Sequence, residues 1–216
     1  MFVVTVDQRG SRSSADLVPR LLADLPALAG TVLPFERTVG DEVQAVLDDA
    51  ASVTEIALHV LRLGTWSVGI GAGEVRLPLP RSTREAAGDA FVAAREAVEA
   101  AKGRGRPAPA AVRGADPLAA GDAEAVLVLL GSVIGRRSPA GWAAVDAVRA
   151  ASDRDGADSA VQRRAAARLG ISQQAVSQRL RAAQWAEEQA VRPTLARLLD
   201  AAGSSTAASG AGGAAG

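Results

Sequence analysis

Residues 162–183 carry polar side chains whose types and spacing suit the recognition of DNA bases. On a helix that begins near residue 172, one face presents Gln173, Gln174, Ser177, Gln178 and Arg181. Glutamine and arginine side chains make paired hydrogen bonds to adenine and guanine in the major groove. We therefore expect these five residues to contact base edges of double-stranded DNA.

Arginine residues flank that face and suit the phosphate backbone of DNA. Arg163, Arg164, Arg168 and Arg179 can donate hydrogen bonds to phosphate oxygens, and Ser172 lies at the start of the same helix. Phosphate contacts position a protein on the duplex without specifying its sequence. These five residues complete the predicted DNA-binding set.

Two short helices joined by a turn must position these side chains. Gly170 can adopt the left-handed conformation that ends a helix, and Ser172 is a suitable N-cap for the next one. The positions expected to face inward are apolar at helical spacing: Ala165, Ala166, Leu169, Val176 and Leu180. This order predicts a helix-turn-helix that reads DNA with residues 172–183, and it resembles the helix-turn-helix of many bacterial regulators. The alternatives are an ordinary helical hairpin and a helix-turn-helix used only for protein contact.

The composition narrows the class of protein. Hydrophobic residues make up 48% of the 216 residues, which is ample for a core. The absence of cysteine excludes disulfide bonds and thiolate metal sites. We find no signal-peptide pattern and expect no apolar stretch of membrane length, so the predicted location is the cytoplasm, without a membrane partner.

Charge is distributed unevenly along a chain of zero net charge. Residues 1–100 have a net charge of −5, whereas residues 161–216 hold seven arginines and three acidic residues, a net charge of +4. The local field controls phosphate contact, so overall neutrality does not exclude DNA binding. It does argue against strong non-specific binding by a monomer, and a homodimer presenting two motifs would bind better.

The order of predicted elements indicates an α+β protein. Strands are expected at residues 2–6, 31–37, 43–47, 66–75 and 110–113, and helices between them at 16–28, 51–63 and 88–102. This order suggests a ferredoxin-like, palm-like antiparallel sheet with helices on one face. Five further helices are expected at residues 122–135, 139–151, 159–169, 172–183 and 185–202. We therefore divide the chain into an α+β domain (1–114), an all-α helix-turn-helix domain (115–202) and a disordered tail (203–216).

Two carboxylates form a second candidate site. Asp7 ends the first predicted strand, and Asp41 lies at the tip of the predicted hairpin, which a ferredoxin-like sheet would place nearby. Such a pair can hold Mg²⁺ together with phosphate oxygens and water. Aspartate is also common in turns for local reasons, so both residues can simply cap turns.

Residues 1–100 resemble the palm domain of class III nucleotide cyclases and of GGDEF-type diguanylate cyclases. The resemblance is carried by Asp7, by residues 38–41 (TVGD) and by residues 69–75 (GIGAGEV). Arg37 replaces the base-recognising lysine of that pattern. The resemblance implies a metal-dependent nucleotide-binding or nucleotide-processing enzyme that uses Asp7 and Asp41.

Most of residues 2–200 resembles the longer form of the SatD family, which ends in a helix-turn-helix. The segments that carry the resemblance are VDQRGSR, FERTVGDEVQAVL, WSVGIGAGEV, GDAFVAAREAV and LGISQQAVSQRLRAAQWAEEQ. It implies a palm-like N-terminal domain and a DNA-binding end, and it assigns no reaction. We therefore expect a transcriptional regulator and not an enzyme, with no required cofactor, and keep the nucleotide enzyme as the alternative.

Three smaller features have structural interpretations. His59 is the only histidine and lacks the partners that a metal site or a catalytic triad needs. Gly69, Gly71 and Gly73 lack the Lys-Ser/Thr of a phosphate loop, so we expect them to allow close backbone packing. Trp142 and Trp185 are expected to lie in the core of the C-terminal half.

Overall fold

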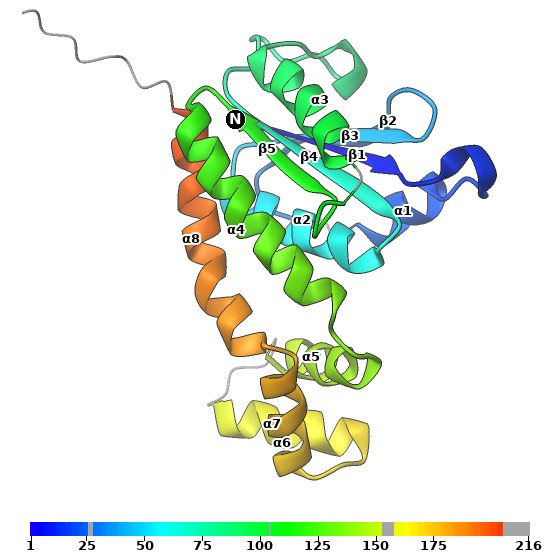
Figure 1. The fold of residues 1–216 in the computed structure, drawn as a ribbon, viewed down its shortest axis with the longest axis vertical. Coiled ribbons are helices and arrows are strands. Elements are labelled where there is room, and N and C mark those ends of the chain that lie inside the picture. The colour runs from blue at the N-terminus through cyan, green and yellow to red at the C-terminus, as the bar shows by residue number, and fades with distance from the viewer. Residues whose placement is uncertain (26–27, 104, 153–157, 205–216) are drawn as a thin grey trace, which may run out of the picture.

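The structure, a computed structural model, is an α+β protein and describes residues 1–25, 28–103, 105–152 and 158–204. Figure 1 shows its five-stranded sheet and, in the described residues, eight α-helices. The strands are β1 Phe2–Gln8, β2 Thr31–Arg37, β3 Glu42–Leu47, β4 Trp66–Ala72 and β5 Ala110–Gly114. The helices are α1 Val18–Asp24, α2 Ala50–Leu63, α3 Asp89–Ala101, α4 Pro117–Gly135, α5 Pro139–Ser152, α6 Asp158–Leu169, α7 Gln173–Ala182 and α8 Trp185–Gly203.

The sheet is mixed, with the strand order β2-β3-β1-β4-β5. The pairs β2–β3, β3–β1 and β1–β4 are antiparallel, whereas β4 and β5 are parallel. The expectation of a purely antiparallel sheet is therefore wrong. Helix α3 connects β4 to β5 and returns the chain to the starting edge, which is the crossover that parallel neighbours require.

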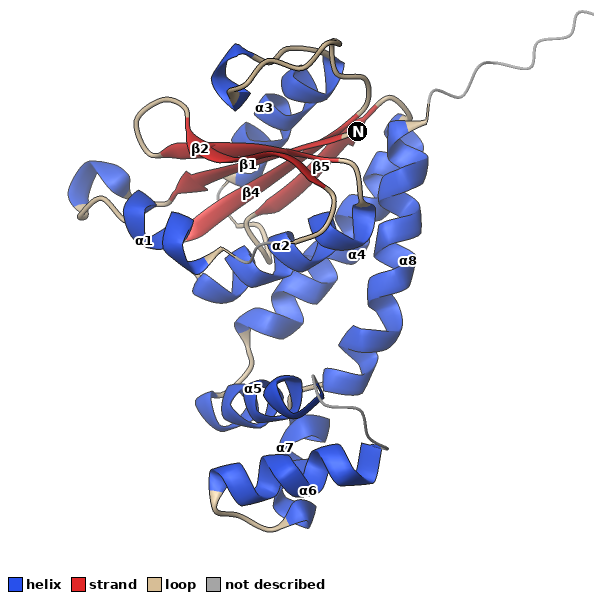
Figure 2. Cartoon of the chain, turned by 180° about the vertical axis from the view of Figure 1, so that it is seen from behind, coloured by secondary structure: helices blue, strands red, loops and turns tan. Residues whose placement is uncertain are grey.

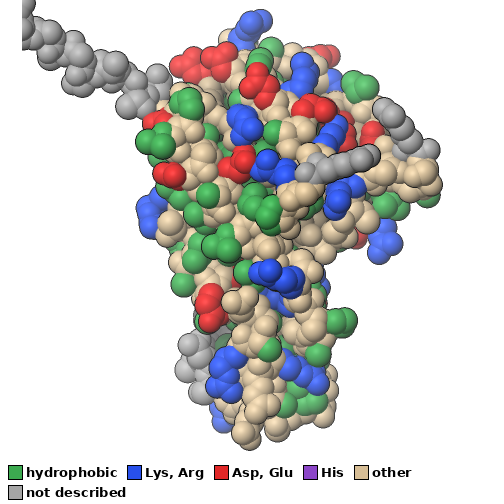
Figure 3. Space-filling view, viewed as in Figure 1, with side chains coloured by type: hydrophobic (Ala, Val, Ile, Leu, Met, Phe, Trp, Pro, Cys, Tyr) green, Lys and Arg blue, Asp and Glu red, His purple; other side chains and the backbone are tan. Residues whose placement is uncertain are grey.

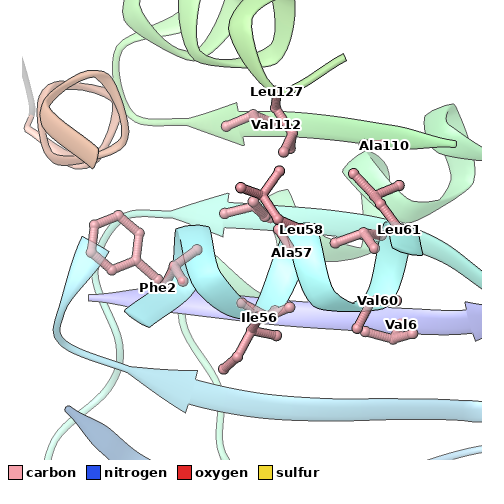
Figure 4. Close-up of a cluster of buried hydrophobic side chains, with 14 of the residues drawn as sticks. Phe2, Val6, Ile56, Ala57, Leu58, Val60, Leu61, Ala110, Val112 and Leu127 are labelled. Atoms are coloured by element: carbon pink, nitrogen blue, oxygen red, sulfur yellow. The ribbon is translucent and has the colours of Figure 1, made fainter. Parts of the chain in front are cut away.

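Helices cover both faces of the sheet, so the prediction of helices on one face is also wrong. Helix α3 lies on one face, and α1, α2, α4 and α8 lie on the other (Figures 1 and 2). Successive side chains of a strand point to opposite faces. Val4 and Val6 of β1 accordingly join the core beneath α2 and α4, while Val3 joins the cluster beneath α3. The larger core, which includes Ile56 of α2 and Leu127 of α4, is drawn in Figure 4.

Helix α3 lies unusually close to β4 because two glycines face it. A Cβ atom on Gly69 would lie 2.2 Å from the backbone nitrogen of Val98, and one on Gly71 would lie 2.1 Å from the carbonyl oxygen of Ala90. No side chain fits at such distances. The expectation that glycines allow close packing is confirmed for Gly69 and Gly71. It is not needed at Gly73, where a Cβ would lie 3.6 Å from its nearest neighbour, the backbone nitrogen of Ala90.

Helices α4 and α8 pack with the sheet rather than apart from it. Leu127 of α4 and Leu195 and Leu199 of α8 are buried in the same core as β1 and β4. The domain boundary expected at residue 114 thus lies between β5 and α4, but the residues on both sides of it belong to one hydrophobic core. Of the expected tail, Gly203 ends α8, and residues 205–216 lie outside the described residues.

Helix α4 is a longer apolar segment than we expected from the sequence. It is 19 residues long with a mean hydropathy of 1.7, so it is long and apolar enough to cross a membrane by those two measures alone. The expectation that no apolar stretch approaches membrane length is therefore wrong. One face of α4 nevertheless belongs to the core described above.

Helices α5, α6 and α7 form a compact unit beyond the far ends of α4 and α8 (Figure 2). They share a second hydrophobic cluster, which contains Val145 and Val148 of α5, Ala165 of α6 and Val176 and Leu180 of α7. Helix α8 runs from this unit back to the sheet. The C-terminal half therefore comprises a three-helix unit and two long helices that carry it.

A buried ion network joins the three-helix unit to the rest of the chain. Glu188 of α8 accepts hydrogen bonds from Arg137 at 2.6 Å and from Arg192 at 2.5 Å. Arg192 and Arg149 also pair with Glu55 of α2. Since α2, α5 and α8 all contribute, the network fixes the angle between the two parts.

The two C-terminal tryptophans lie at this junction and are only partly buried. The guanidinium carbons of Arg62 and Arg137 lie 3.9 and 4.4 Å from the ring centre of Trp142. Arg149 and Arg192 approach Trp185 in the same way. Both rings pack against the second cluster, as expected, but their other surfaces meet cations, an attractive arrangement.

Candidate nucleic-acid interface

The turn between α6 and α7 has the local geometry expected from the sequence. Gly170 has a φ of +65°, and the amide of Ile171 donates to the carbonyl of Ala166 at 3.1 Å, which closes the end of α6. Ser172 then caps α7, because its hydroxyl oxygen accepts a hydrogen bond from the amide of Ala175 at 3.1 Å. The helix-ending role of Gly170 and the capping role of Ser172 are confirmed, and DNA contact by Ser172 stays a prediction.

The inward faces of both helices are also as expected. Ala165 and Ala166 of α6 are buried, as are Val176 and Leu180 of α7, and all four join the cluster with α5. The small side chains on α6 let α7 cross it closely. Helix α7 is therefore held firmly by one face, which fixes the direction of the other.

The outward face of α7 carries the residues predicted to touch bases. Gln173, Gln174, Gln178 and Arg181 are exposed, and Ser177 is half-buried. Gln174, Gln178 and Arg181 project from the side of α7 opposite Val176 and Leu180. Gln173 lies on the side of those two residues but is exposed at the first turn, and Ser177 lies at the flank. The structure thus brings three of the five predicted base-contacting residues onto one accessible surface.

The predicted phosphate-contacting arginines divide into two groups. Arg163 and Arg168 of α6 are exposed and Arg179 of α7 is half-buried, so all three reach the surface around α7. Arg164 differs, because it is half-buried and donates to the carbonyl of Ala151 at 2.8 Å. That carbonyl lies in the last turn of α5, where a cation is favoured. Arg164 therefore ties α6 to α5, and its contact with phosphate stays a prediction.

Helices α6 and α7 carry an excess of positive charge. No acidic residue occurs between Asp158 and Glu187, a stretch that holds five arginines. Lys and Arg side chains mark the surface of the three-helix unit in Figure 3. This excess of positive charge favours the approach of a polyanion, although Glu187 of α8 lines the same pocket as Ser177 and Arg181.

The second candidate site is built differently from the prediction. Asp7 pairs with Glu42 across β1 and β3, next to the hairpin tip that carries Asp41, so the two aspartates are neighbours as expected. Burial raises the pKa of the Asp7 carboxyl. Its hydrogen bond with Lys102, whose Nζ lies 2.9 Å from Oδ2, opposes that rise, and the negative charge of Asp41 adds to it.

These contacts do not match a magnesium site. Lys102 already neutralises Asp7, and within the described parts of the chain no three His, Cys, Asp or Glu residues are grouped as metal ligands. Mg²⁺ needs oxygen ligands in octahedral geometry, and an ammonium group in contact with one of two carboxylates opposes the binding of a second cation. Sequence reasoning missed Lys102, although as the only lysine of the chain it was conspicuous.

The chain matches no protein-family model, no curated protein and no solved structure. The resemblances to the SatD family and to nucleotide cyclases therefore stay predictions. The interpretation of both candidate sites depends on their own geometry and charge.

Proposed function

We propose that the protein is a sequence-specific DNA-binding regulator that places α7 in the major groove of double-stranded DNA. The observation that carries the proposal is the outward face of α7, where Gln174, Gln178 and Arg181 are exposed on a helix fixed by its opposite face. These are the side chains best able to distinguish adenine and guanine. Helices α6 and α7 then act as a helix-turn-helix.

The surroundings of α7 support the same proposal. Arg163 and Arg168 lie on α6 and Arg179 on α7, where they suit phosphates beside the groove. The N-terminus of α7 adds amide groups and the positive end of a helix dipole. We assign these groups to positioning and assign the glutamines and Arg181 to specificity.

The N-terminal part serves sensing or dimerisation in this proposal. Its first four strands follow the order β2-β3-β1-β4 with antiparallel pairing, which supports a ferredoxin-like arrangement extended by β5. The ion network around Glu188 would transmit a change in that part to the three-helix unit. No observation favours the nucleotide enzyme, since Lys102 neutralises Asp7.

Selection of DNA sites from a random pool, followed by gel-shift titration, tests the proposal. We expect a short preferred sequence and a roughly linear fall of log affinity with log salt. The double variant Gln174→Ala/Arg181→Ala should lose at least tenfold in affinity for that sequence, because each paired contact contributes about 1–3 kcal/mol of discrimination. Arg76→Ala removes the same charge from an exposed position after β4 and should bind normally.

Arg168→Ala separates positioning from specificity. It should weaken binding to all sequences similarly and lower the salt slope by about 1. A protein with no sequence preference, or a double variant that binds like the wild type, contradicts the proposal. Binding without a phosphate-scale salt dependence would instead support a helix-turn-helix used only for protein contact.

A further inference from the structure

The outer face of α4 is an apolar surface that no other described element covers. Leu118 is 78% exposed and Leu129 is 60% exposed, although α4 is the most apolar long helix of the fold. Seven residues share this face at spacings of three and four, and we call them the α4 stripe: Leu118, Asp122, Ala125, Leu129, Ser132, Val133 and Arg136. Val126 lies at the edge of this face and packs against the larger core. Figure 3 shows hydrophobic side chains along this helix.

The α4 stripe is complementary to itself when it is reversed. Leu129 lies at its centre, with Asp122 seven residues before it and Arg136 seven residues after it. Ala125 and Val133 likewise lie four residues to either side. A copy of the helix running in the opposite direction therefore places Arg136 beside Asp122, and Val133 beside Ala125.

We propose that the α4 stripe is a dimer interface that takes the α4 stripe of a second copy in antiparallel orientation, with Leu129 on the two-fold axis. Such an interface is isologous, since the same patch serves both partners. Leu129 meets its own counterpart at the centre. The small side chain of Ala125 leaves room for the facing Val133 of the other copy.

Charge selects this partner and this orientation. Asp122 and Arg136 are exposed, and neither forms an ion pair in the described part of the chain. An antiparallel pair brings each aspartate to an arginine at both ends of the interface, whereas a parallel pair opposes like charges. One helix pair is small compared with a standard interface of about 800 Å² per partner, so the association should be weak, in the micromolar range.

A lipid bilayer is a poorer occupant of the same surface. Leu127, Leu130 and Ile134 on the opposite side of α4 are buried in the core, and insertion of the helix would expose that core. Asp122 and Arg136 would also place two charges on the lipid-facing side. The observations therefore favour a second protein chain.

The antiparallel orientation has a consequence for DNA, which rests on the proposed function. The three-helix unit lies beyond the C-terminal end of α4 (Figure 1). Reversing one copy puts the two α7 helices at opposite ends of the dimer. The dimer would then bind two well-separated half-sites of one duplex, or two separate DNA segments, rather than adjoining half-sites.

Sedimentation equilibrium of the full chain tests the dimer without DNA. We expect a monomer–dimer equilibrium whose dissociation constant rises at least about tenfold in Leu129→Asp. Leu77→Asp, an equally drastic change at another exposed leucine, should dimerise normally. Asp122→Arg and Arg136→Asp should each weaken the dimer, and combining them should restore it, because the ion pairs are then reversed.

Cysteine cross-linking tests the orientation, since the chain has no cysteine of its own. Leu129→Cys should form a disulfide dimer on oxidation. A mixture of Asp122→Cys and Arg136→Cys chains should form the mixed dimer, and Asp122→Cys alone should not cross-link. Gln174→Ala/Arg181→Ala should leave every one of these results unchanged, which separates failure of the dimer from failure of DNA binding.

Three results would overturn the proposal. The first is a wild-type chain that stays monomeric at about 100 μM, where a micromolar dimer would be fully formed. The second is efficient self-cross-linking of Asp122→Cys, which means parallel pairing. The third is co-sedimentation with phosphatidylcholine vesicles that Leu129→Asp abolishes, which assigns the α4 stripe to a membrane.

Discussion

Glu188→Gln should lower the stability of the protein strongly, although the two side chains have nearly the same shape. The side chain of Glu188 is 1% exposed, and that of Arg137 is 0% exposed, with 2.6 Å between their closest atoms. Arg137 also donates to the carbonyl of Ala183, but its Nη1 has no hydrogen-bond partner among the described residues. Glu188→Gln keeps the shape and removes the charge that compensates Arg137.

The magnitude follows from leaving a buried cation without its anion. Breaking a buried pair by removing one partner costs about 3–5 kcal/mol. Arg192 and Arg149 are less buried than Arg137, and water screens them in part, so the lower end of that range applies. A loss of about 3 kcal/mol should lower the melting temperature by about 6–12 °C in a chain of this size.

Urea unfolding followed by tryptophan fluorescence measures this effect, because Trp142 and Trp185 both lie at the junction. Glu187→Gln is the matched control, since Glu187 is the exposed neighbour on α8 and its neutralisation should change stability by less than about 0.5 kcal/mol. Arg137→Met should also destabilise, and Arg137→Met/Glu188→Gln should cost less than the sum of the two. A Glu188→Gln variant as stable as Glu187→Gln would refute the reasoning.

Three further predictions concern the fold. Gly71→Ala should destabilise the protein by at least about 1–3 kcal/mol, because the new Cβ would overlap the backbone of α3, and chemical denaturation would show a lower midpoint. Gly170→Ala should cost about 1–2 kcal/mol from its φ of +65° alone, since a Cβ there meets no atom within 4 Å; an unchanged melting temperature would contradict this. Burial lowers the pKa of His59, so protonation favours the unfolded chain and stability should fall as pH drops below about 6.5. His59→Gln should flatten that dependence between about pH 7 and 5, and an unaltered pH profile would exclude this role.

The sequence predicted those features whose conformation depends on residues close together in the chain. The glycine at 170 and the serine at 172 define the turn between α6 and α7, and both conformations depend on atoms within a few residues. The hairpin after Arg37 follows from Gly40 in the same way. The start of α4 was predicted near residue 122 but lies at Pro117, directly after the N-cap Asp116. An aspartate followed by a proline is itself a helix-start signal in the sequence.

The sequence did not predict the side-chain contacts between segments that are far apart in the chain. Arg164 was assigned to phosphates, but the end of α5 supplies a carbonyl that holds it. Asp7 was paired with a metal, but Lys102, at the end of α3, reaches it first. Arginine and lysine side chains are long and flexible, so their partners depend on which elements the fold brings within reach.

The sequence by itself determined the α+β class, the capped turn at Gly170 and the polar face of α7, because short-range sterics and helical periodicity control them. Only the tertiary structure decided the parallel position of β5, the placement of helices on both faces and the partners of Arg164 and Asp7. It also decided which side of α4 stays exposed. All of these features depend on contacts between segments far apart in the chain, and the energies of such contacts cannot be inferred from a local sequence pattern.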